Sequence, residues 1–313
     1  MINGDKIMTR YASSGVIVLL VLMGLFTGCI DETSSSQILY VDAEGEQQFT
    51  HIQDAIDAAE NNMTIFVYSG IYVENLKISN KSLILTGENP DTTIIDGNYS
   101  NDVLFVEADA QVTLSNFTLQ HSGNTSTVAN YDAIVSIHSS NNTIVHNIIK
   151  NGNVGIYIAH APKNNISKNH IKHQQEYGVY VYSSSDEVIL FDNEFRDNTC
   201  GARVKQSDHC TVFENLFQDN DKGFYFCCGS SSNTAYHNTF INNSVWNACD
   251  YVGGNKWYAS LPVGGNYWDE YTGLDNFSGP GQDQPGSDGI GDKPFADSKA
   301  DIDDLYPLME PYL

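Results

Sequence analysis

Two acidic residues occupy equivalent positions in neighbouring segments of similar sequence. Asp192 and Glu214 are 22 residues apart, and if these segments stack as successive turns of one fold, their carboxyl groups come to lie about 5 Å apart. Two carboxyls at that separation can serve as the acid and the nucleophile of a glycosidase. The same column also contains His146, Lys168 and His237. A surface ion pair between Lys168 and Asp192 is therefore the favoured interpretation, and the two acids are weak catalytic candidates.

Flat rings and cations form a second set of candidate side chains, because the outward positions of several short alternating runs align into adjacent columns. One column holds Tyr157, Tyr180, Arg203 and Tyr225, its neighbour holds Ala159, Tyr182, Lys205 and Cys227, and the next face holds Lys150, Lys172 and Arg196. Rings at regular spacing can stack on sugar faces, and cations favour carboxylated or sulfated glycans. The predicted ligand-binding residues are Tyr157, Tyr180, Tyr182, Arg203, Lys205 and Tyr225. Alternatively, these side chains cover the sheet and stack on one another.

Cysteines are concentrated in the last repeats, at Cys200, Cys210, Cys227, Cys228 and Cys249. Cys227 and Cys249 are 22 residues apart, which matches one turn, so they form a possible disulfide in an exported protein. Their number is odd, so at least one thiol stays unpaired, and single buried thiols that fill the core are the plainest alternative. No CxxC or His-x-His spacing supports a soft-metal site, so copper is not favoured.

The C-terminal segment is strongly acidic, with eleven acidic residues against two lysines from Gly264 onward. Asp283, Asp288 and Asp292 are separated by glycines and offer hard oxygen ligands on a flexible loop, so they are weak candidates for a Ca²⁺ site. A solvated acidic loop that covers the last turn is the favoured interpretation. None of these patterns requires a cofactor.

A repeat of 22 to 24 residues must position these side chains. One element recurs five times, and its asparagines are Asn147, Asn169, Asn193, Asn215 and Asn238. An apolar residue stands three positions before each, and after the first four comes Gly155, Gly178, Gly201 or Gly223. Each glycine opens an alternating apolar run typical of a short strand.

The spacing of inward residues indicates how the strands turn. An odd step between two inward residues requires a bend, where asparagine tolerates the left-handed conformation and its amide can bond the asparagines stacked above and below. Three short strands per turn, with Gly or Asn at each corner, predict an all-β fold, a single-stranded parallel β-helix over residues 38–262. We expect it to be a monomer.

Both ends of this solenoid are predicted to be covered. Residues 50–60 have the pattern of an amphipathic helix, with Thr50 and Gln53 as a capping box. This helix would cover the N-terminal end, where unpaired strand edges would otherwise be exposed. Residues 263–313 form the predicted acidic tail, which packs on the last turn.

The first 28 residues are predicted to be a lipoprotein signal peptide. Lys6 and Arg10 precede an uncharged stretch of twelve residues, which is shorter than the roughly 20 apolar residues of a membrane span. The small residues before Cys29 resemble a lipobox, which implies cleavage before Cys29, a lipid on its sulfur and a tether over residues 29–37. An ordinary signal peptide with an incidental cysteine is the alternative.

The composition limits the class of partner. The chain has 313 residues, with 15 basic and 39 acidic side chains and a net charge of −24, so nucleic acid is not an expected partner. Its 31 asparagines outnumber its 25 glycines, and 41% of its residues are apolar, which is enough to bury a core.

Several segments resemble a known family of solenoid proteins. Phe49–Ile56, Val67–Glu74, Leu83–Gly87 and Ile95–Gly97 look like the opening of pectin-lyase-like right-handed β-helix proteins, and the later repeats look like NosD-type repeats. Residues 265–269, 287–292 and 304–309 are similar to the C-terminal segment of archaeal surface proteins with that domain. The resemblance covers about residues 38–313 and implies a right-handed β-helix of the NosD-like family.

The resemblance does not name an activity, because the superfamily includes lyases, hydrolases, esterases and non-enzymes. The catalytic strings of pectinesterases and polygalacturonases are missing, so an enzyme is not favoured. We expect an extracellular protein, lipid-anchored to the outer face of the cytoplasmic membrane, that binds polysaccharide or cell-envelope glycan or forms part of the envelope. The alternatives are a polysaccharide-acting lyase, hydrolase or esterase, and a NosD-like accessory protein that handles copper, since NosD denotes a periplasmic protein needed to mature a copper enzyme.

Overall fold

The computed structural model describes residues 38–127 and 130–312. The predicted signal peptide over residues 1–28, the lipidation at Cys29 and the tether over residues 29–37 lie outside the described residues. Within the described part, no helix combines the length and the apolar character needed to cross a membrane.

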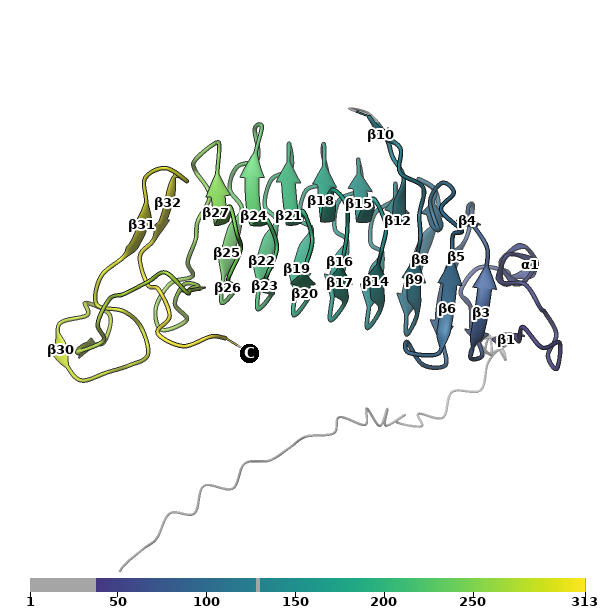
Figure 1. Ribbon diagram of the computed structural model, residues 1–313, viewed down its shortest axis with the longest axis horizontal. Helices are drawn as coiled ribbons and strands as arrows, with labels where there is room; N and C mark the ends of the chain where they lie inside the picture. The colour runs from purple at the N-terminus through teal and green to yellow at the C-terminus, as the bar shows by residue number, and fades with distance from the viewer. Residues whose placement is uncertain (1–37, 128–129, 313) are drawn as a thin grey trace, which may run out of the picture. The chain divides into compact units, whose positions relative to one another are not determined.

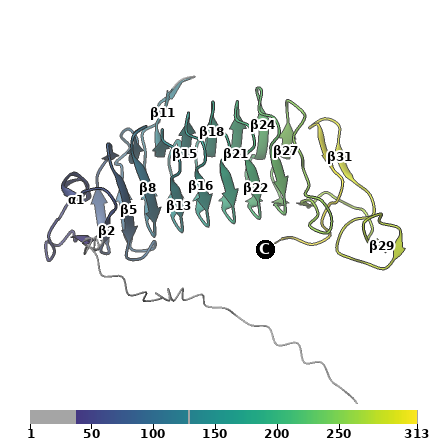
Figure 2. The ribbon, with the colours of Figure 1, turned by 180° about the vertical axis from the view of Figure 1, so that it is seen from behind.

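The chain coils into a solenoid in which each turn contributes one strand to each of three parallel sheets (Figures 1 and 2). Sheet 1 consists of β1 (Ile38–Val41), β2 (Met63–Val67), β5 (Ser82–Gly87), β8 (Gln111–Ser115), β13 (Thr143–Val145), β16 (Asn165–Ser167), β19 (Ile189–Phe191), β22 (Thr211–Phe213) and β25 (Thr234–Tyr236). Sheet 2 consists of β3 (Gly70–Val73), β6 (Thr93–Asp96), β9 (Thr118–Gln120), β14 (Ile148–Lys150), β17 (His170–Lys172), β20 (Glu194–Arg196), β23 (Leu216–Gln218), β26 (Thr239–Ile241) and β28 (Tyr267–Trp268). Sheet 3 consists of β4 (Leu76–Ile78), β7 (Leu104–Val106), β12 (Ala133–Ile137), β15 (Val154–Ala159), β18 (Tyr177–Tyr182), β21 (Cys200–Lys205), β24 (Lys222–Cys227) and β27 (Trp246–Asp250). The predicted all-β parallel solenoid is therefore confirmed.

Short elements outside the three sheets lie at the ends of the stack or project from it. The helix α1 (Ile52–Ala58) lies at the N-terminal end, and the hairpin of β31 (Phe295–Asp297) and β32 (Ile302–Asp304) lies at the other end (Figure 1). Two further antiparallel pairs are β10 (Ser126–Thr127) with β11 (Asn130–Tyr131), and β29 (Phe277–Ser278) with β30 (Gln284–Pro285).

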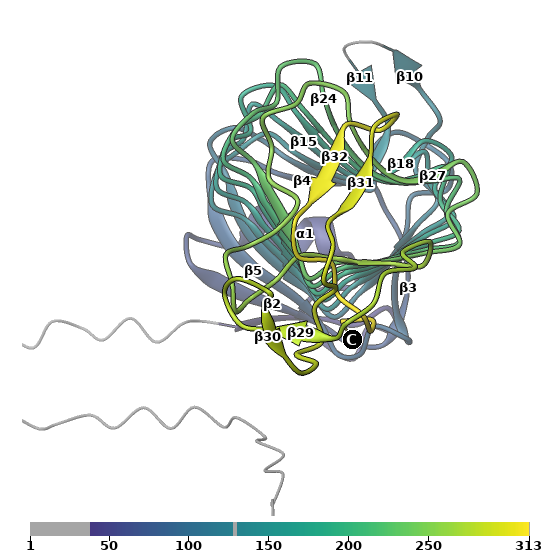
Figure 3. The ribbon, with the colours of Figure 1, turned by 90° about the vertical axis from the view of Figure 1, so that its left-hand side faces the viewer.

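Columns of apolar side chains fill the interior, turn upon turn, inside the coil seen end-on in Figure 3. The residues three positions before the repeated asparagines are each at most 1% exposed; they are Ile144, Ile166, Leu190, Val212 and Ala235. Another column stacks the aromatic rings of Phe195, Phe217, Phe240 and Trp268, with successive centroids 4.7, 5.1 and 4.6 Å apart. Burial of these columns against each other supplies the main hydrophobic stabilisation of the stack.

The predicted asparagine ladder is confirmed at the corner between sheets 1 and 2. Asn147 donates from both its backbone N–H and its side-chain amide to Asn169 Oδ1, at 3.0 and 3.1 Å. Asn169 makes the same two bonds to Asn193, and the pattern continues through Asn215 and Asn238. Because these side chains are buried, the ladder satisfies backbone groups that the bend would otherwise leave unpaired.

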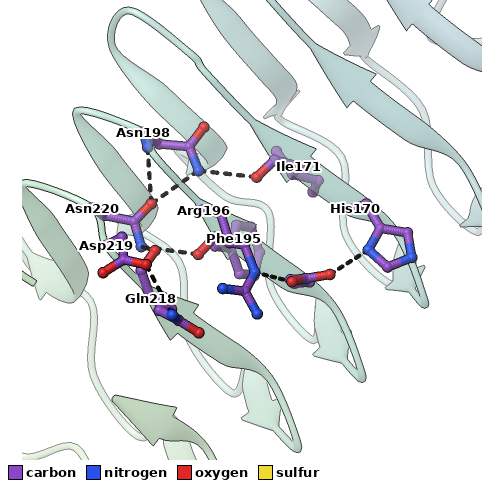
Figure 4. Close-up of polar contacts among 9 residues, drawn as sticks. His170, Ile171, Phe195, Arg196, Asn198, Gln218, Asp219 and Asn220 are labelled. Carbon is purple, nitrogen blue, oxygen red and sulfur yellow. Dashed lines mark hydrogen bonds and ion pairs between the residues drawn. The ribbon is translucent and has the colours of Figure 1, made fainter. Parts of the chain in front are cut away.

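A second ladder, which we did not predict, lies at the corner between sheets 2 and 3. Asn198 donates from its backbone and its amide to Asn220 Oδ1, at 3.0 Å each, and its amide also donates to the carbonyl of Ile171 at 3.0 Å (Figure 4). Asn220 continues to Asn243 in the same way. Two corners of the coil therefore use the same chemistry.

The left-handed conformation falls one residue before the position that we predicted. His146, Lys168, Asp192, Glu214 and His237 have φ between 54° and 57°, whereas the ladder asparagines that follow them do not have positive φ. The asparagine must direct its amide inward to reach the next turn, so the strained bend is carried by the outward residue before it.

The repeated glycines are required by close backbone approach and not by a positive φ. A Cβ on Gly178 would lie 2.3 Å from the carbonyl oxygen of Gly201, and a Cβ on Gly201 would lie 2.5 Å from that of Gly223. Only a residue without a side chain fits where successive turns come this close.

The predicted capping box of Thr50 and Gln53 is wrong, although the helix itself is present as α1. The N-cap residue is His51, and no side chain of the cap bonds the helix. Instead, Glu74 accepts hydrogen bonds from the backbone N–H groups of Ile52 and Gln53, at 2.9 and 3.0 Å. A carboxylate from the next turn therefore caps the helix, which a local sequence pattern does not reveal.

The acidic tail is joined to the last turn through a buried carboxylate. Asn266 continues the first ladder by accepting from the backbone N–H of Asn238 at 3.0 Å. Asp304 is 0% exposed and accepts from the backbone N–H of Asn266 at 2.7 Å and from Trp268 Nε1 at 2.9 Å. Burial raises the pKa of Asp304 to about 6, despite these hydrogen bonds.

Candidate functional site

The outward columns of sheet 3 have the predicted register. Tyr157 is opposite Tyr180, Tyr180 is opposite Arg203, and Arg203 is opposite Tyr225. In the adjacent column Tyr182 is opposite Lys205. We call the group formed here the tyrosine–arginine cluster; its members are Tyr131, Tyr157, Tyr177, Tyr180, Tyr182, Arg203 and Tyr225.

The central rings of this cluster are buried and do not form an open ledge. Tyr157 and Tyr180 are 3% and 2% exposed, because their rings pack on each other and on Tyr131 of β11, with centroids 5.5 to 5.8 Å apart. Burial raises the pKa of Tyr157 to about 12. The predicted stacking of a sugar on these two rings therefore has no accessible face, and only the edge of the cluster meets solvent.

Arg203 holds the cluster together. Its guanidinium carbon lies 5.5, 5.0 and 5.2 Å from the ring centroids of Tyr177, Tyr180 and Tyr225, and its Nη1 donates to the hydroxyl of Tyr177 at 2.9 Å. Three cation–π contacts, each worth about 1 kcal/mol, fix the guanidinium in place.

The edge of the cluster carries two cations that have no acidic partner among the residues the structure describes. Arg203 and Lys205 are both partly exposed, and Lys205 Nζ lies 5.0 Å from the ring centroid of Tyr182. Over residues 38–127 and 130–312, the ion pairs involve other cations, such as Lys77 with Glu107 and Lys163 with Glu187. We call Tyr182, Arg203 and Lys205 the cationic rim.

The candidate acids lie on a different surface. Asp192 and Glu214 line a groove of about 600 Å³ at the corner between sheets 1 and 2, together with His146, Lys168 and Tyr312. The expected ion pair between Lys168 and Asp192 does not form in the described structure. The groove thus presents groups of both charge signs, of which His170 and Glu194 are paired.

The end of the chain closes one side of this groove. The ring of Tyr312 stacks on His237, with centroids 4.2 Å apart. Its backbone N–H donates to Thr239 Oγ1 at 3.0 Å, and its carbonyl accepts from the same hydroxyl at 3.0 Å.

In the third cationic column, on sheet 2, one of the three cations has an acidic partner. Lys150, Lys172 and Arg196 are opposite one another as predicted. Arg196 contacts Glu194, which also contacts His170 of the preceding turn (Figure 4). Lys150 and Lys172 belong to none of the ion pairs of the described residues, so this face also carries positive charge, but the cation–π contacts of the described residues are those of Arg203 and Lys205 on sheet 3.

The five cysteines within the described residues are all free thiols. The predicted stacking of Cys227 on Cys249 is wrong, because Cys249 lies opposite Tyr225. Residues that lie opposite each other in β24 and β27 are 24 positions apart, as Lys222 and Trp246 are. Cys249 follows Cys227 by only 22 positions, so the two cysteines are not opposite each other. Cys200 and Cys210 are buried, and burial raises the pKa of the Cys210 thiol to about 12.

The acidic residues proposed for Ca²⁺ are used to hold their own loop. Asp292 accepts from the backbone N–H groups of Asn276 and Phe277 at 3.0 Å, and Asp288 accepts from Gly279 and Ile290 at 3.2 and 3.1 Å. Asp283 is exposed. These carboxylates satisfy backbone donors in a loop with little regular structure.

The sequence did not indicate that Tyr131 and Tyr177 belong to the tyrosine–arginine cluster, or that Cys228 lies beside it. Tyr131 and Tyr177 lie outside the alternating columns, and Cys228 follows the end of β24. The contacts of Tyr131 and Tyr177 depend on how the loops fold back onto sheet 3, which spacing does not reveal. The only sequence signal for these two tyrosines is that they lie close to the repeats.

Comparison with known proteins agrees with the architecture. A family model described as periplasmic copper-binding protein (NosD) matches residues 30–273. The chain belongs to the NosD family. No curated protein matches the chain.

The fold is also found in solved structures. The complex of XylC with xylose is 11% identical, with a TM-score of 0.59, and the match covers 78% of this chain and 67% of that one. Pectin methylesterase from carrot is 12% identical with a TM-score of 0.46, covering 72% of this chain and 90% of that one. The family match and the likeness to XylC place the NosD-family chain in the pectin-lyase-like right-handed β-helix fold, and the family description indicates a location outside the cytoplasm.

The copper in the family's description does not fit the donors present. Within the described residues, no group of three or more His, Cys, Asp or Glu side chains is arranged to hold a metal ion. The adjacent thiols of Cys227 and Cys228 both face the guanidinium of Arg203, whose positive charge opposes a bound cation.

Proposed function

We propose that this protein is an exported β-helix that binds anionic polysaccharide through the cationic rim of Tyr182, Arg203 and Lys205. The observation that carries the proposal is the pair of neighbouring cations on β21, which contact aromatic rings and have no acidic partner in the described part of a chain whose net charge is −24. Cations held side by side give this surface a local positive potential within an acidic chain. A carboxylated or sulfated glycan supplies the missing negative charge.

The geometry of the rim supports recognition of a sugar polymer. Arg203 is held rigidly by its tyrosine contacts, so few rotamers are lost when its free N–H groups bind an anion. The ring of Tyr182 beside Lys205 offers an apolar surface next to the charge. Tyr157 and Tyr180 act beneath the rim as supports and not as stacking platforms.

We further propose that a lipid on Cys29 holds the β-helix at the outer face of the cytoplasmic membrane. The short apolar stretch before Cys29 and the periplasmic description of the NosD family support this placement. Mass spectrometry of the protein extracted from membranes tests it: a diacylglycerol adduct at an N-terminal Cys29 is expected, and a chain that still begins upstream of Cys29 contradicts it.

Calorimetric titration with polygalacturonate, a sulfated glycosaminoglycan and neutral xylan tests the binding proposal. We expect affinity for one or both anionic polymers and none for xylan. The double variant Arg203→Gln/Lys205→Gln should lose about tenfold or more in affinity, corresponding to about 1.4 kcal/mol. The control Lys150→Gln/Lys172→Gln removes the same charge from sheet 2 and should bind like the wild type.

Because Arg203 also supports the cluster, the single variant Lys205→Gln and a thermal melt accompany the double variant. Lys205 makes one cation–π contact, so its loss should reduce affinity without lowering the melting temperature. Equal affinity of wild type and Lys205→Gln, or equal loss in the sheet 2 control, would overturn the proposal.

The groove beside Asp192 and Glu214 favours a second candidate function, a polysaccharide-acting enzyme. It brings two carboxylates on successive turns together with His146 and Lys168 in a hollow of about 600 Å³. The same polymers are incubated with the protein, and products are separated by chromatography. Cleavage or de-esterification that Asp192→Asn abolishes would support this candidate, and unchanged polymers would remove it.

A further inference from the structure

Two adjacent cysteines lie at the end of β24, in different environments. Cys227 is 3% exposed, whereas Cys228 is exposed and has a φ of 60°. The backbone at Cys228 is left-handed, and the sulfur atoms of both cysteines lie beside the guanidinium of Arg203.

Arg203 reaches both sulfur atoms. Its Nε donates to Cys227 Sγ at 3.3 Å, and its Nη2 approaches Cys228 Sγ at 3.9 Å. Lys205 is opposite Cys227 in the sheet. Two cations beside a sulfur stabilise the thiolate, which is the nucleophilic form of cysteine.

The electrostatics distinguish Cys228 from the other thiols of the described residues. Partial burial tends to raise its pKa, but the hydrogen bonds from Cys227 and Arg203 and the charges of Arg203 and Lys205 outweigh this, so the pKa of Cys228 is lowered. Burial raises the pKa of Cys200, Cys210, Cys227 and Cys249. Cys228 is also the exposed one of these five thiols.

We propose that Cys227 and Cys228 form a thiol–disulfide exchange site that reacts with a low-molecular-weight disulfide. The thiolate of Cys228 attacks one sulfur of the disulfide RSSR, the S–S bond breaks, and RS⁻ leaves. The product is a mixed disulfide of Cys228 with SR. Cys227 then loses its proton to solvent and attacks Cys228 Sγ, which releases the second RS⁻ and forms the Cys227–Cys228 bond. In balance, two protein thiols are oxidised and one RSSR is reduced to two RSH.

The resulting bond between neighbours should be easily reversed. Adjacent Cα atoms are about 3.8 Å apart across a trans peptide, closer than the roughly 4.4 to 6.8 Å that suits an unstrained disulfide. Strained, exposed disulfides have higher reduction potentials and are the labile ones. The site is therefore suited to reversible exchange in an oxidising compartment and not to structural cross-linking. It does not depend on glycan binding.

The test uses the full chain with Cys29→Ser, so that only the five cysteines of the described residues can react with the reagent. The protein is mixed with 5,5′-dithiobis(2-nitrobenzoate), and the released thionitrobenzoate is followed by absorbance. We expect a fast release and then a second release, after which the intact mass shows loss of two hydrogens and no retained nitrobenzoate.

Variants separate the two steps. Cys228→Ser should abolish the fast phase, and Cys227→Ser should keep it but stop at the mixed disulfide, which intact mass detects. Arg203→Gln should slow the fast phase several-fold near pH 7 and move its pH midpoint upward, whereas Arg196→Gln should not. If Arg203→Gln alters the fold by thermal melt, Lys205→Gln replaces it with the same expected upward shift. A fast phase that survives Cys228→Ser, or a mixed disulfide that persists in the chain with both cysteines, would overturn the proposal.

Discussion

At the residue scale, Glu74 shows how one side chain can join parts of the chain that are distant in sequence. It belongs to the segment Val67–Glu74, which resembles the opening of pectin-lyase-like β-helix proteins, and its carboxylate caps α1 through Ile52 and Gln53. This residue therefore has a structural role at the N-terminal end of the solenoid.

Replacing Glu74 by Ala should lower the free energy of unfolding by about 1 kcal/mol, because the first N–H groups of α1 lose their acceptor. Urea unfolding measures the loss. Glu46→Ala, at an exposed position near the same helix, is the control and should have no effect. A stability equal to that of the wild type would show that water caps the helix equally well.

The buried carboxylate of Asp304 makes stability depend on pH. Burial raises its pKa to about 6 in the folded protein, against about 3.9 in an unfolded chain. The folded state therefore holds the proton more tightly, and the stability that this group contributes is complete below about pH 4 and is lost as the pH rises through 6.

Comparison of wild type with Asp304→Asn, which cannot titrate, isolates this effect. The stability of the wild type relative to the variant should fall by up to about 3 kcal/mol between pH 4 and pH 7. Thermal melts at four pH values measure the difference, and Asp303→Asn on the same strand, at an exposed position, is the control. A constant difference across this range would mean that the hydrogen bonds to Asp304 keep its folded pKa near the unfolded value.

At the element scale, the close approach of successive turns sets the sequence of each strand in sheet 3. Gly201→Ala would place a Cβ 2.5 Å from the carbonyl oxygen of Gly223 and 2.7 Å from Cδ1 of Phe217. The turns must then separate or the ring must move, and we expect a loss of about 1 to 3 kcal/mol. Chemical denaturation measures it against Thr199→Ala, an exposed position before the same strand. A neutral Gly201→Ala would show that the stack accommodates wider spacing.

The sequence predicted the elements well where the repeat is regular. The ladder of Asn147 to Asn238 and the register of Tyr180, Arg203 and Tyr225 follow from spacing alone, because a parallel solenoid repeats one geometry in each turn. The pairing of Cys227 with Cys249 failed where the spacing changes in the last turn. Burial of Tyr157 and Tyr180 also escaped prediction, since Tyr131 reaches them from a hairpin outside the repeat.

At the scale of the whole molecule, the cationic rim lies within a chain of net charge −24. An approaching polyanion therefore meets repulsion from the protein as a whole and attraction from Arg203 and Lys205 at contact. The range of each effect depends on salt, since the Debye length is about 30 Å at 0.01 M, about 10 Å at 0.1 M and about 3 Å at 1 M.

Affinity for an anionic polysaccharide should consequently pass through a maximum as salt increases. At about 0.01 M salt, carboxylates far from the rim repel the polymer and weaken binding. Near about 0.1 M this repulsion is screened, while the attraction of the rim still acts at short range. Toward about 1 M the attraction between the rim and the polymer is screened as well. Titrations of polygalacturonate at these concentrations measure the profile. Lys205→Gln should flatten the decline at high salt and keep the rise at low salt, because it removes only the local attraction. A steady fall in affinity from the lowest salt onward would contradict this, because it would mean that the polymer is attracted to the protein at long range despite the net charge of −24.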